Sequence, residues 1–222
     1  MCKILISPSI LSGDFVNMKK SVSAISDWGG DLVHCDVMDG VYVSNLTFGM
    51  PMVSAIKKIT SLPLDVHLMI TRPEKYIDAF IEAGADYLTF HPDASESIEC
   101  ARDALKKIQS KGVKSGIVFN PNIKFKDYSE LMYYCDIVLI MSVYAGYGGQ
   151  KFIPESLDKV SEAKEFIKKN KLNIPIEIDG GITESNAKAA IDAGVTILVA
   201  GSAIYKSVDP RTTIKKLKLE IE

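Results

Sequence analysis

Short apolar runs alternate with longer amphipathic segments along the whole chain. This rhythm predicts successive βα units around a buried parallel sheet. The apolar runs have the length of buried strands, and we expect strands at residues 4–6, 32–35, 64–68, 87–90, 115–119, 137–140, 176–178 and 197–199.

The segments between these runs have helical periodicity. We expect helices at residues 15–28, 51–59, 73–83, 95–111, 128–134, 154–169, 186–193 and 209–221. Pro73 and Pro154 suit the first turn of a helix, where no backbone donor is lost. Gly84, Gly112 and Gly194 follow expected helix ends, where a left-handed residue is favoured.

Eight strand–helix units in a chain of 222 residues favour a closed (β/α)8 TIM barrel of the α/β class. A doubly wound sheet usually has fewer strands, so it is the weaker alternative. No low-complexity stretch or long linker divides the chain, and we therefore expect a single domain spanning residues 1–222. In such a barrel, chemistry is carried at the C-terminal ends of the strands.

Polar residues with metal-binding chemistry lie where this fold requires them. All three histidines, His34, His67 and His91, lie near the end of an expected strand. His34 and Asp36 are two residues apart, so their side chains point to the same face of a strand. If that face is the barrel interior, His67 and Asp179 join them, and two imidazoles with two carboxylates suit zinc, manganese, iron or cobalt. A lone histidine on a strand is more often a core residue, so the argument depends on the joint pattern.

Small residues follow the last two expected strands. Gly180, Gly181, Gly201 and Ser202 can offer backbone N–H groups and a hydroxyl to a phosphate, in the usual phosphate-binding position of these barrels. Each pair also fits an ordinary turn. The loop after strand six contains three glycines, which permit close approach to a ligand or lid motion, although a flexible surface loop has the same composition: Gly146, Gly148 and Gly149.

Three methionines end expected strands two, three and six. Methionine usually fills gaps in a core. Here Met38, Met69 and Met141 would lie beside the proposed metal, where they could form an apolar wall that excludes water.

Composition excludes several classes of protein. The net charge is −2, which does not match the basic surface of a nucleic-acid-binding protein. No apolar stretch approaches the ~20 residues of a membrane helix, and the N-terminal apolar run is too short for a signal peptide. The spacing of the four cysteines indicates no disulfide framework, so we expect reduced thiols in a cytoplasmic protein: Cys2, Cys35, Cys100 and Cys135.

Together these motifs resemble the ribulose-phosphate 3-epimerase family along nearly the full chain. The resemblance is carried by an ordered set of segments whose combination is far more specific than any one of them: Ser7-Pro8-Ser9-Ile10-Leu11, His34-Cys35-Asp36-Val37-Met38-Asp39-Gly40, Asn45-Leu46-Thr47-Phe48-Gly49, Leu64-Asp65-Val66-His67-Leu68-Met69, Asp179-Gly180-Gly181-Ile182 and Gly201-Ser202. It implies a barrel of the ribulose-phosphate-binding type and interconversion of D-ribulose 5-phosphate and D-xylulose 5-phosphate, a reaction of the pentose phosphate pathway.

The resemblance also implies roles for particular residues. His34, Asp36, His67 and Asp179 would bind one divalent metal ion per subunit, zinc being the first choice and iron, manganese or cobalt the alternatives. Asp36 and Asp179 would also act as the acid/base pair. The substrate would be bound by a wider set that includes the loop covering it and the phosphate-binding residues: Ser9, His67, Gly146, Tyr147, Gly148, Gly149, Asp179, Gly180, Gly181, Gly201 and Ser202. The implied partners are a small ketose phosphate and further copies of the chain in a homo-oligomer.

Two departures from the family pattern leave the substrate open. Tyr144-Ala145 stands where the family usually has an acidic or polar residue and then proline, which could loosen the lid and reshape the mouth. His91-Pro92-Asp93 stands where the family commonly has histidine, any residue and glutamate. Both bear on substrate preference more than on reaction type, and D-allulose 6-phosphate is the alternative substrate.

The expected residues match what epimerisation at carbon 3 requires. A proton alpha to a carbonyl is removed from one face and returned to the other, through an enediolate whose charge a metal can stabilise. Two carboxyl groups on opposite sides can provide the base and the acid. A metal-independent decarboxylase would instead need a lysine at a strand end, and the expected strand ends contain none. A non-catalytic sugar-phosphate sensor would have a broken ligand set, whereas all four candidate ligands are present.

Overall fold

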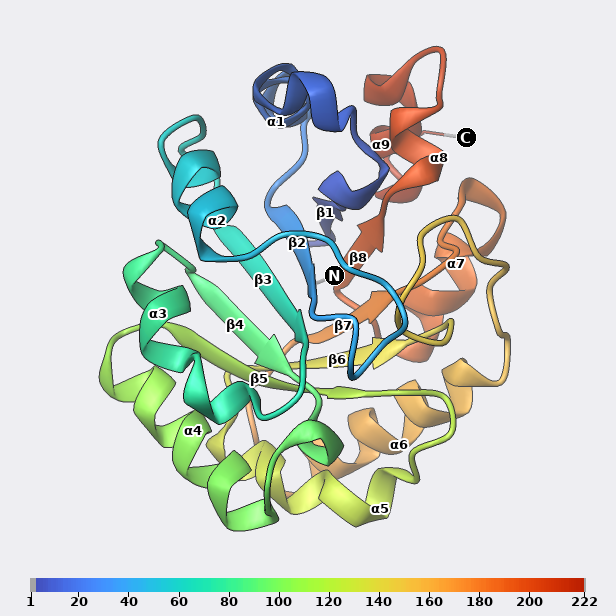
Figure 1. Cartoon of the computed structure of the whole chain (residues 1–222). Coiled ribbons are helices and arrows are strands. Elements are labelled where there is room, and N and C mark those ends of the chain that lie inside the picture. Colours follow the sequence, from blue (N-terminus) through green and yellow to red (C-terminus); the bar gives the residue numbers. More distant parts are fainter. Residues whose placement is uncertain (1–2, 222) are drawn as a thin grey trace.

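The computed structural model describes residues 3–221, which form a barrel of eight parallel strands surrounded by helices (Figure 1). The strands are β1 (Leu5–Pro8), β2 (Val33–Met38), β3 (Leu64–Met69), β4 (Tyr87–Phe90), β5 (Lys114–Phe119), β6 (Ile137–Met141), β7 (Ile176–Asp179) and β8 (Ile197–Ala200). The expected strands all form, with ends that differ by at most three residues, and the TIM-barrel prediction is confirmed.

Neighbouring strands pair in the order β1-β8-β7-β6-β5-β4-β3-β2. The remaining gap, between β1 and β2, is bridged by an isolated parallel pair of Ser9 and His34. In addition, the backbone N–H of Asp31 donates to the carbonyl of Ile6 over 2.9 Å. The barrel is therefore nearly closed, and this seam brings the end of β1 next to the polar residues of β2.

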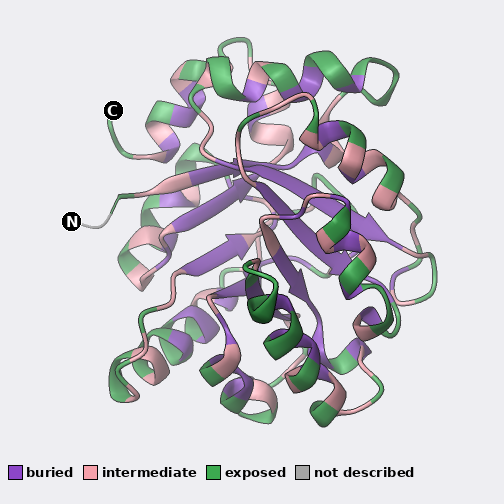
Figure 2. Ribbon diagram, turned by 90° about the vertical axis from the view of Figure 1, so that its left-hand side faces the viewer, coloured by how far each residue is buried: buried purple, intermediate pink, exposed green. Residues whose placement is uncertain are grey.

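The outer layer contains helices α1 (Met18–Trp28), α2 (Met50–Lys57), α3 (Ile77–Glu82), α4 (Ile98–Ser110), α5 (Phe125–Tyr128), α6 (Ser156–Lys169), α7 (Glu184–Ala193), α8 (Ser202–Tyr205) and α9 (Pro210–Leu217). Short 3-10 turns lie between them: η1 (Ile10–Ser12), η2 (Phe15–Asn17), η3 (Pro73–Lys75), η4 (Pro92–Ala94) and η5 (Ser129–Tyr134). The strands are buried, and each helix turns its exposed residues outward (Figure 2).

Several helix predictions need correction. The predicted helices 15–28 and 73–83 each begin with a separate 3-10 turn, η2 and η3, ahead of α1 and α3. Residues 129–134 form a 3-10 turn after a short α-helix, because a period of three aligns the buried Ser129 and Met132 on one face. Pro154 lies before α6 and its N-cap, not in the first turn. The last helix ends at Leu217, and Leu219 has a left-handed backbone that stops its continuation.

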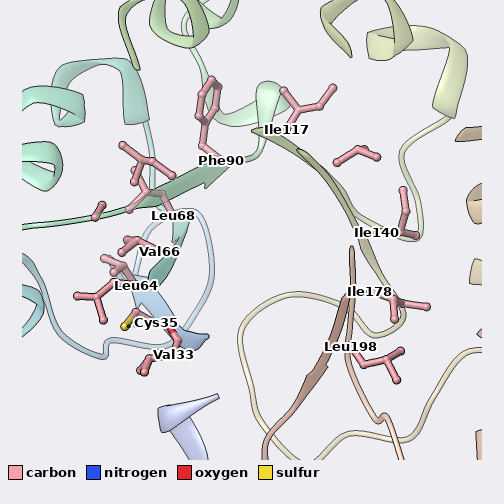
Figure 3. Close-up of a cluster of buried hydrophobic side chains, with 14 of the residues drawn as sticks. Val33, Cys35, Leu64, Val66, Leu68, Phe90, Ile117, Ile140, Ile178 and Leu198 are labelled. Carbon is pink, nitrogen blue, oxygen red and sulfur yellow. Dashed lines mark hydrogen bonds between the residues drawn. The ribbon is translucent and has the colours of Figure 1, made fainter. Parts of the chain in front are cut away.

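The main hydrophobic core lies between the strands and the helices. Figure 3 shows alternate strand side chains pointing away from the barrel axis, among them Val66 and Leu68 of β3 and Ile140 of β6. The other side chains of the same strands point into the barrel, because successive residues of a strand face opposite sides.

Glycines end three of the helical segments as expected. Gly84, Gly112 and Gly194 all have positive φ, at 105°, 77° and 130°. Among the described residues the cysteines Cys35, Cys100 and Cys135 are free thiols, and Cys2 lies outside those residues.

Candidate active site

Four side chains converge inside the C-terminal end of the barrel. Asp36 Oδ1 lies 3.2 Å from His34 Nε2 and 3.3 Å from His67 Nδ1. Asp179 Oδ2 lies 3.8 Å from His34 Nε2. One potential ligand atom from each of the four residues lies within 4.8 Å of all the others, as a single cation would require. The structure therefore brings together the four side chains that the sequence pattern singled out.

The local sequence explains why these atoms meet. His34 and Asp36 alternate on β2 with the outward-facing Cys35, and β3 pairs with β2 so that His67 lies opposite Asp36. Thr47 holds the end of β2 in place, because its hydroxyl donates to the carbonyl of Asp36 over 2.6 Å and accepts from the Met38 N–H. A loop residue thus stabilises the strand end that presents the carboxylate.

The donor atoms fit a divalent metal. His34 Nε2 and His67 Nδ1 are buried ring nitrogens without a hydrogen-bond partner, which is costly unless another group uses their lone pairs. Both nitrogens face the Asp36 carboxylate, and the combination of two imidazoles and two carboxylates is typical of zinc and related metals. The arrangement itself does not identify the metal.

The two carboxyl groups differ in their surroundings. Burial, together with the negative charge of Asp36, raises the pKa of Asp179 to about 7. Burial also acts to raise the pKa of Asp36, but the His34 and His67 imidazoles outweigh it and lower that pKa. Ser9 Oγ donates to Asp36 Oδ2 over 2.6 Å, which also favours the ionised form. Such a division suits one carboxylate as base and one carboxylic acid as proton donor.

A pocket opens above these four residues. His34 and His67 are fully buried and do not line it. Most of the residues predicted to bind substrate or metal do line it: Ser9, Asp36, Gly146, Tyr147, Gly148, Gly149, Asp179, Gly180, Gly181, Gly201 and Ser202. Met38, Met69 and Met141 end their strands and also line the pocket. No lysine or arginine lines it within residues 3–221.

Close packing requires glycine at one position of the predicted phosphate-binding end. A Cβ on Gly181 would lie 2.5 Å from the backbone N of Phe152, and Gly181 has a φ of 64°. A Cβ on Gly201 would lie 2.5 Å from Ser12 Oγ, a side-chain atom that can rotate away. Gly181 therefore has no room for a side chain, whereas a side chain at Gly201 would have to displace the Ser12 hydroxyl.

The glycine loop is held by the loop that follows β2. Ser44 Oγ lies 2.7 Å from the Tyr147 hydroxyl, and Asn45 Nδ2 donates to the Gly146 carbonyl over 3.0 Å. Gln150 Nε2 donates to the carbonyls of Tyr144 and Tyr147 over 2.7 and 2.9 Å. The loop is thus ordered by side-chain hydrogen bonds in the absence of the family's proline.

The two departures from the family pattern have different surroundings. Tyr144 is 56% exposed and does not line the pocket, whereas Ala145 does. Asp93 accepts a hydrogen bond from the Tyr42 hydroxyl over 3.1 Å, and the Tyr42 ring packs 4.9 Å from His91. Asp93 is therefore connected to His91 through the Tyr42 side chain.

Sequence reasoning missed three buried polar residues around the predicted ligands. Asp65 and Glu177 lie one layer below them, and His91 follows β4 and contacts His67; all three are fully buried and had no assigned role. Asp65 and Glu177 each lie two residues before a predicted ligand, so the alternation that grouped His34 with Asp36 could also have found them. Burial raises the pKa of Glu177 well above its usual value, and the nearby Asp65 charge adds to this.

Further residues of the pocket were also not predicted. All but Val199 of β8 come from segments that follow strands, and none carries a charge, so nothing in their chemistry marked them: Leu11, Ser12, Val143, Ala145, Gln150, Ile182 and Val199. None of the helices within residues 3–221 combines the length and apolar character that crossing a membrane requires.

Comparisons with known proteins point to one family. The model of the ribulose-phosphate 3 epimerase family matches residues 5–205. The chain is 41% identical over 216 residues to ribulose-phosphate 3-epimerase of Bacillus subtilis, covering 97% of this chain and 98% of that protein. It is 42% identical over 215 residues to the chloroplastic ribulose-5-phosphate-3-epimerase of Arabidopsis thaliana, covering 97% of this chain and 76% of that protein.

Solved structures support the fold independently. A crystal structure of 3-hexulose-6-phosphate synthase matches with a TM-score of 0.68 at 19% identity, covering 99% of this chain and 100% of that chain. At this level of identity the likeness establishes the barrel architecture and leaves the chemistry to the site itself.

Proposed function

The chain belongs to the ribulose-phosphate 3-epimerase family and is an isomerase, and from this premise we propose that it interconverts D-ribulose 5-phosphate and D-xylulose 5-phosphate by two-base proton transfer in a metal-containing site. The observation that supports this most directly is the convergence of Asp36, Asp179, His34 and His67 beneath one pocket. Both carboxyl groups reach the same point from well-separated strands.

Asp36 and Asp179 are the two proton-transferring groups in this proposal. They come from β2 and β7, which are separated by β1 and β8 on one side of the barrel and by four strands on the other. A substrate lying between them would present one face of carbon 3 to each carboxyl group. One carboxylate removes the proton, the other carboxylic acid returns a proton to the opposite face, and the roles exchange in the reverse direction.

His34, His67, Asp36 and Asp179 would hold one divalent cation per subunit, with zinc as the first choice among zinc, iron, manganese and cobalt. The partnerless nitrogens of His34 and His67 support this. When bound, such a cation supplies Lewis-acid stabilisation of the negative charge that develops on the substrate oxygens. The carboxylate oxygens that do not face the cation remain available for proton transfer.

The pocket residues orient the substrate and exclude water. Ser9 donates to Asp36 and so fixes the direction of that carboxylate. Met38, Met69 and Met141 provide an apolar wall around carbon 3, which slows exchange of the transferred proton with bulk water. Gly146–Gly149 cover the substrate, and the backbone at Gly180, Gly181, Gly201 and Ser202 holds its phosphate.

The decisive assay compares D-ribulose 5-phosphate with D-allulose 6-phosphate on the same metal-analysed preparation. We expect the pentose phosphate to have the higher kcat/KM, and a clear preference for the hexose phosphate would overturn the substrate assignment. In D2O, deuterium should appear at carbon 3 of the product. A product without deuterium would contradict two-base transfer through groups that exchange with solvent.

Two further expectations belong to the same proposal. The protein acts in the cytoplasm, an expectation based on the free thiols of Cys35, Cys100 and Cys135. It works as a homo-oligomer, as the family resemblance implies. Light scattering on the purified protein measures the second directly, and a monomeric mass would contradict it.

A further inference from the structure

Each metal-facing histidine has a second ring nitrogen that contacts another fully buried side chain. His34 Nδ1 lies 2.6 Å from Asp65 Oδ2, and His67 Nε2 lies 2.9 Å from His91 Nε2. The nitrogens that face the candidate cation are thus Nε2 on His34 and Nδ1 on His67. The two imidazoles point opposite ring positions at the same place.

We propose that Asp65 and His91 are positioning residues that select these opposite tautomers and hold both rings ready for the metal. The inference rests on the proposed function, because it assumes that His34 and His67 are ligands. It adds two residues to which the family resemblance gave no role. Neither touches the pocket, so both act through the ligands they contact.

The hydrogen-bonding capacity of imidazole makes the assignment definite on the His34 side. A neutral imidazole has one N–H donor and one acceptor nitrogen. Asp65 Oδ2 can only accept while ionised, and it also accepts from the Ser7 hydroxyl over 2.9 Å. The hydrogen of His34 therefore lies on Nδ1, and the lone pair of Nε2 is directed at Asp36 and Asp179.

The same reasoning assigns the tautomer of His67, whose hydrogen-bond acceptor is the neutral imidazole of His91. Because His67 Nδ1 must carry the lone pair, its hydrogen lies on Nε2 and is donated to His91 Nε2. His91 must then hold its own hydrogen on Nδ1. The ring of His91 is kept in place by Tyr42, whose hydroxyl accepts from Asn120 Nδ2 over 2.8 Å and donates to Asp93. Asp93, where the family commonly has glutamate, thus reaches the site through Tyr42 and His91.

The hydrogen bond from His34 to Asp65 should be stronger than the one from His67 to His91. A charged acceptor makes a shorter and stronger hydrogen bond than a neutral one, and it increases the basicity of the imidazole it holds. Replacing Asp65 should therefore cost more metal affinity than replacing His91. Loss of such a supporting partner typically weakens metal binding by ~10–100-fold.

The test measures Zn²⁺ affinity by competition with a chromophoric chelator, without any substrate. Asp65→Asn should raise the Kd for Zn²⁺ by ~10–100-fold, and His91→Phe, which keeps a ring against Tyr42, by about 10-fold at most. Thr89→Val is the matched control, since Thr89 is equally buried beside His67 on β4 but contacts neither histidine ring nitrogen. Its Kd should stay within about twofold of the original chain. Unchanged affinity in Asp65→Asn would overturn the proposal.

A second measurement keeps the proposal testable if a variant does not fold. In the zinc-loaded original protein, two-bond ¹⁵N–¹H NMR correlations of the imidazoles distinguish Nδ1–H from Nε2–H. We expect Nδ1–H for His34 and Nε2–H for His67, and the opposite tautomer at either ring would refute the assignment. Epimerase activity of the same sample distinguishes failure of this inference from failure of the proposed function.

Active protein with the opposite tautomers would contradict only this inference, whereas inactive protein with the expected tautomers would contradict the proposed function. A protein that binds no Zn²⁺ contradicts both the zinc assignment and this inference.

Discussion

Alternate residues of β2 and β3 face the inside and the outside of the barrel, and the two faces differ in chemistry and in role. Outward-facing residues such as Val66 and Leu68 pack against helices in a continuous apolar layer (Figure 3). Inward-facing residues such as Asp36 and His67 are equally buried but polar. One face therefore stabilises the fold, and the other holds the candidate chemistry at fixed distances.

The energetic consequences of burial have opposite signs on the two faces. Apolar surface gains roughly 25 cal/mol per Å² when it is removed from water. Buried carboxylates and imidazoles lose hydration and need close partners to compensate. Asp65 finds partners in Ser7 and His34, whereas the inner nitrogens of His34 and His67 find none among protein groups. Burial of the outer apolar layer must therefore offset the unfavourable free energy of burying the inner polar groups.

The largest effect should come from the inner face. Asp36→Asn keeps the size of the side chain but removes a base, and we expect kcat to fall by ~100–10,000-fold. Far-UV circular dichroism and thermal unfolding should show an intact fold. Near-normal turnover in this variant would exclude Asp36 from the mechanism and would contradict the assignment of the chemistry to the inner face.

The matching change on the outer face should do the reverse. Leu68→Ala lies next to His67 on β3 but faces the helices, and it should lower the free energy of unfolding by ~2–5 kcal/mol. Urea unfolding measures this loss, and kcat per folded molecule should change by less than about twofold because His67 stays in place. A large loss of kcat with little loss of stability would mean that the two faces are not separable.

Alternation explains what could be predicted from the sequence. Apolar runs located all eight strands, and the His34–Asp36 spacing placed two candidate ligands on one face, because strand geometry depends only on local sequence. The network of Tyr42, Asp93 and Asn120 could not be found this way. Its members come from three different strand-to-helix loops, and their contacts depend on how distant loops pack.

The 3-10 turn at residues 129–134 shows another limit. Its sequence, Ser-Glu-Leu-Met-Tyr-Tyr, fits a helical turn of either kind, and packing of Leu131 and Met132 against the core selects the tighter one. The predicted phosphate-binding end shows a third limit. Ser12 of η1 lines the pocket beside Gly201, but a lone serine carries no signal until the fold brings the two together.

Metal removal should affect activity, as the inner-face substitution does, and also stability, as the outer-face substitution does. A cation that binds only the folded state stabilises it by about 2.7 kcal/mol at 100 times its Kd. We therefore expect a chelator to lower the midpoint of thermal unfolding of the original protein while abolishing activity. The Asp36→Asn variant is the control, since the same treatment should lower its midpoint less. An equal shift in both proteins would indicate that the chelator acts elsewhere than at this site.

The smallest effect should come from the loops above the inner face, where packing is weakest. Tyr147 is 55% exposed, and its hydroxyl contacts Ser44 across 2.7 Å, so Tyr147→Phe removes one hydrogen bond worth ~0.5–1.5 kcal/mol. If this contact holds the glycine loop over the pocket, KM should rise by up to about 10-fold with kcat nearly unchanged, because Asp36 and Asp179 do not move. Tyr144→Phe is the control, since Tyr144 is similarly exposed but does not line the pocket. Equal kinetics for both variants would show that Ser44 and Tyr147 do not hold the loop during turnover. A fall in kcat would show instead that the loop, like the inner face, positions the reacting groups.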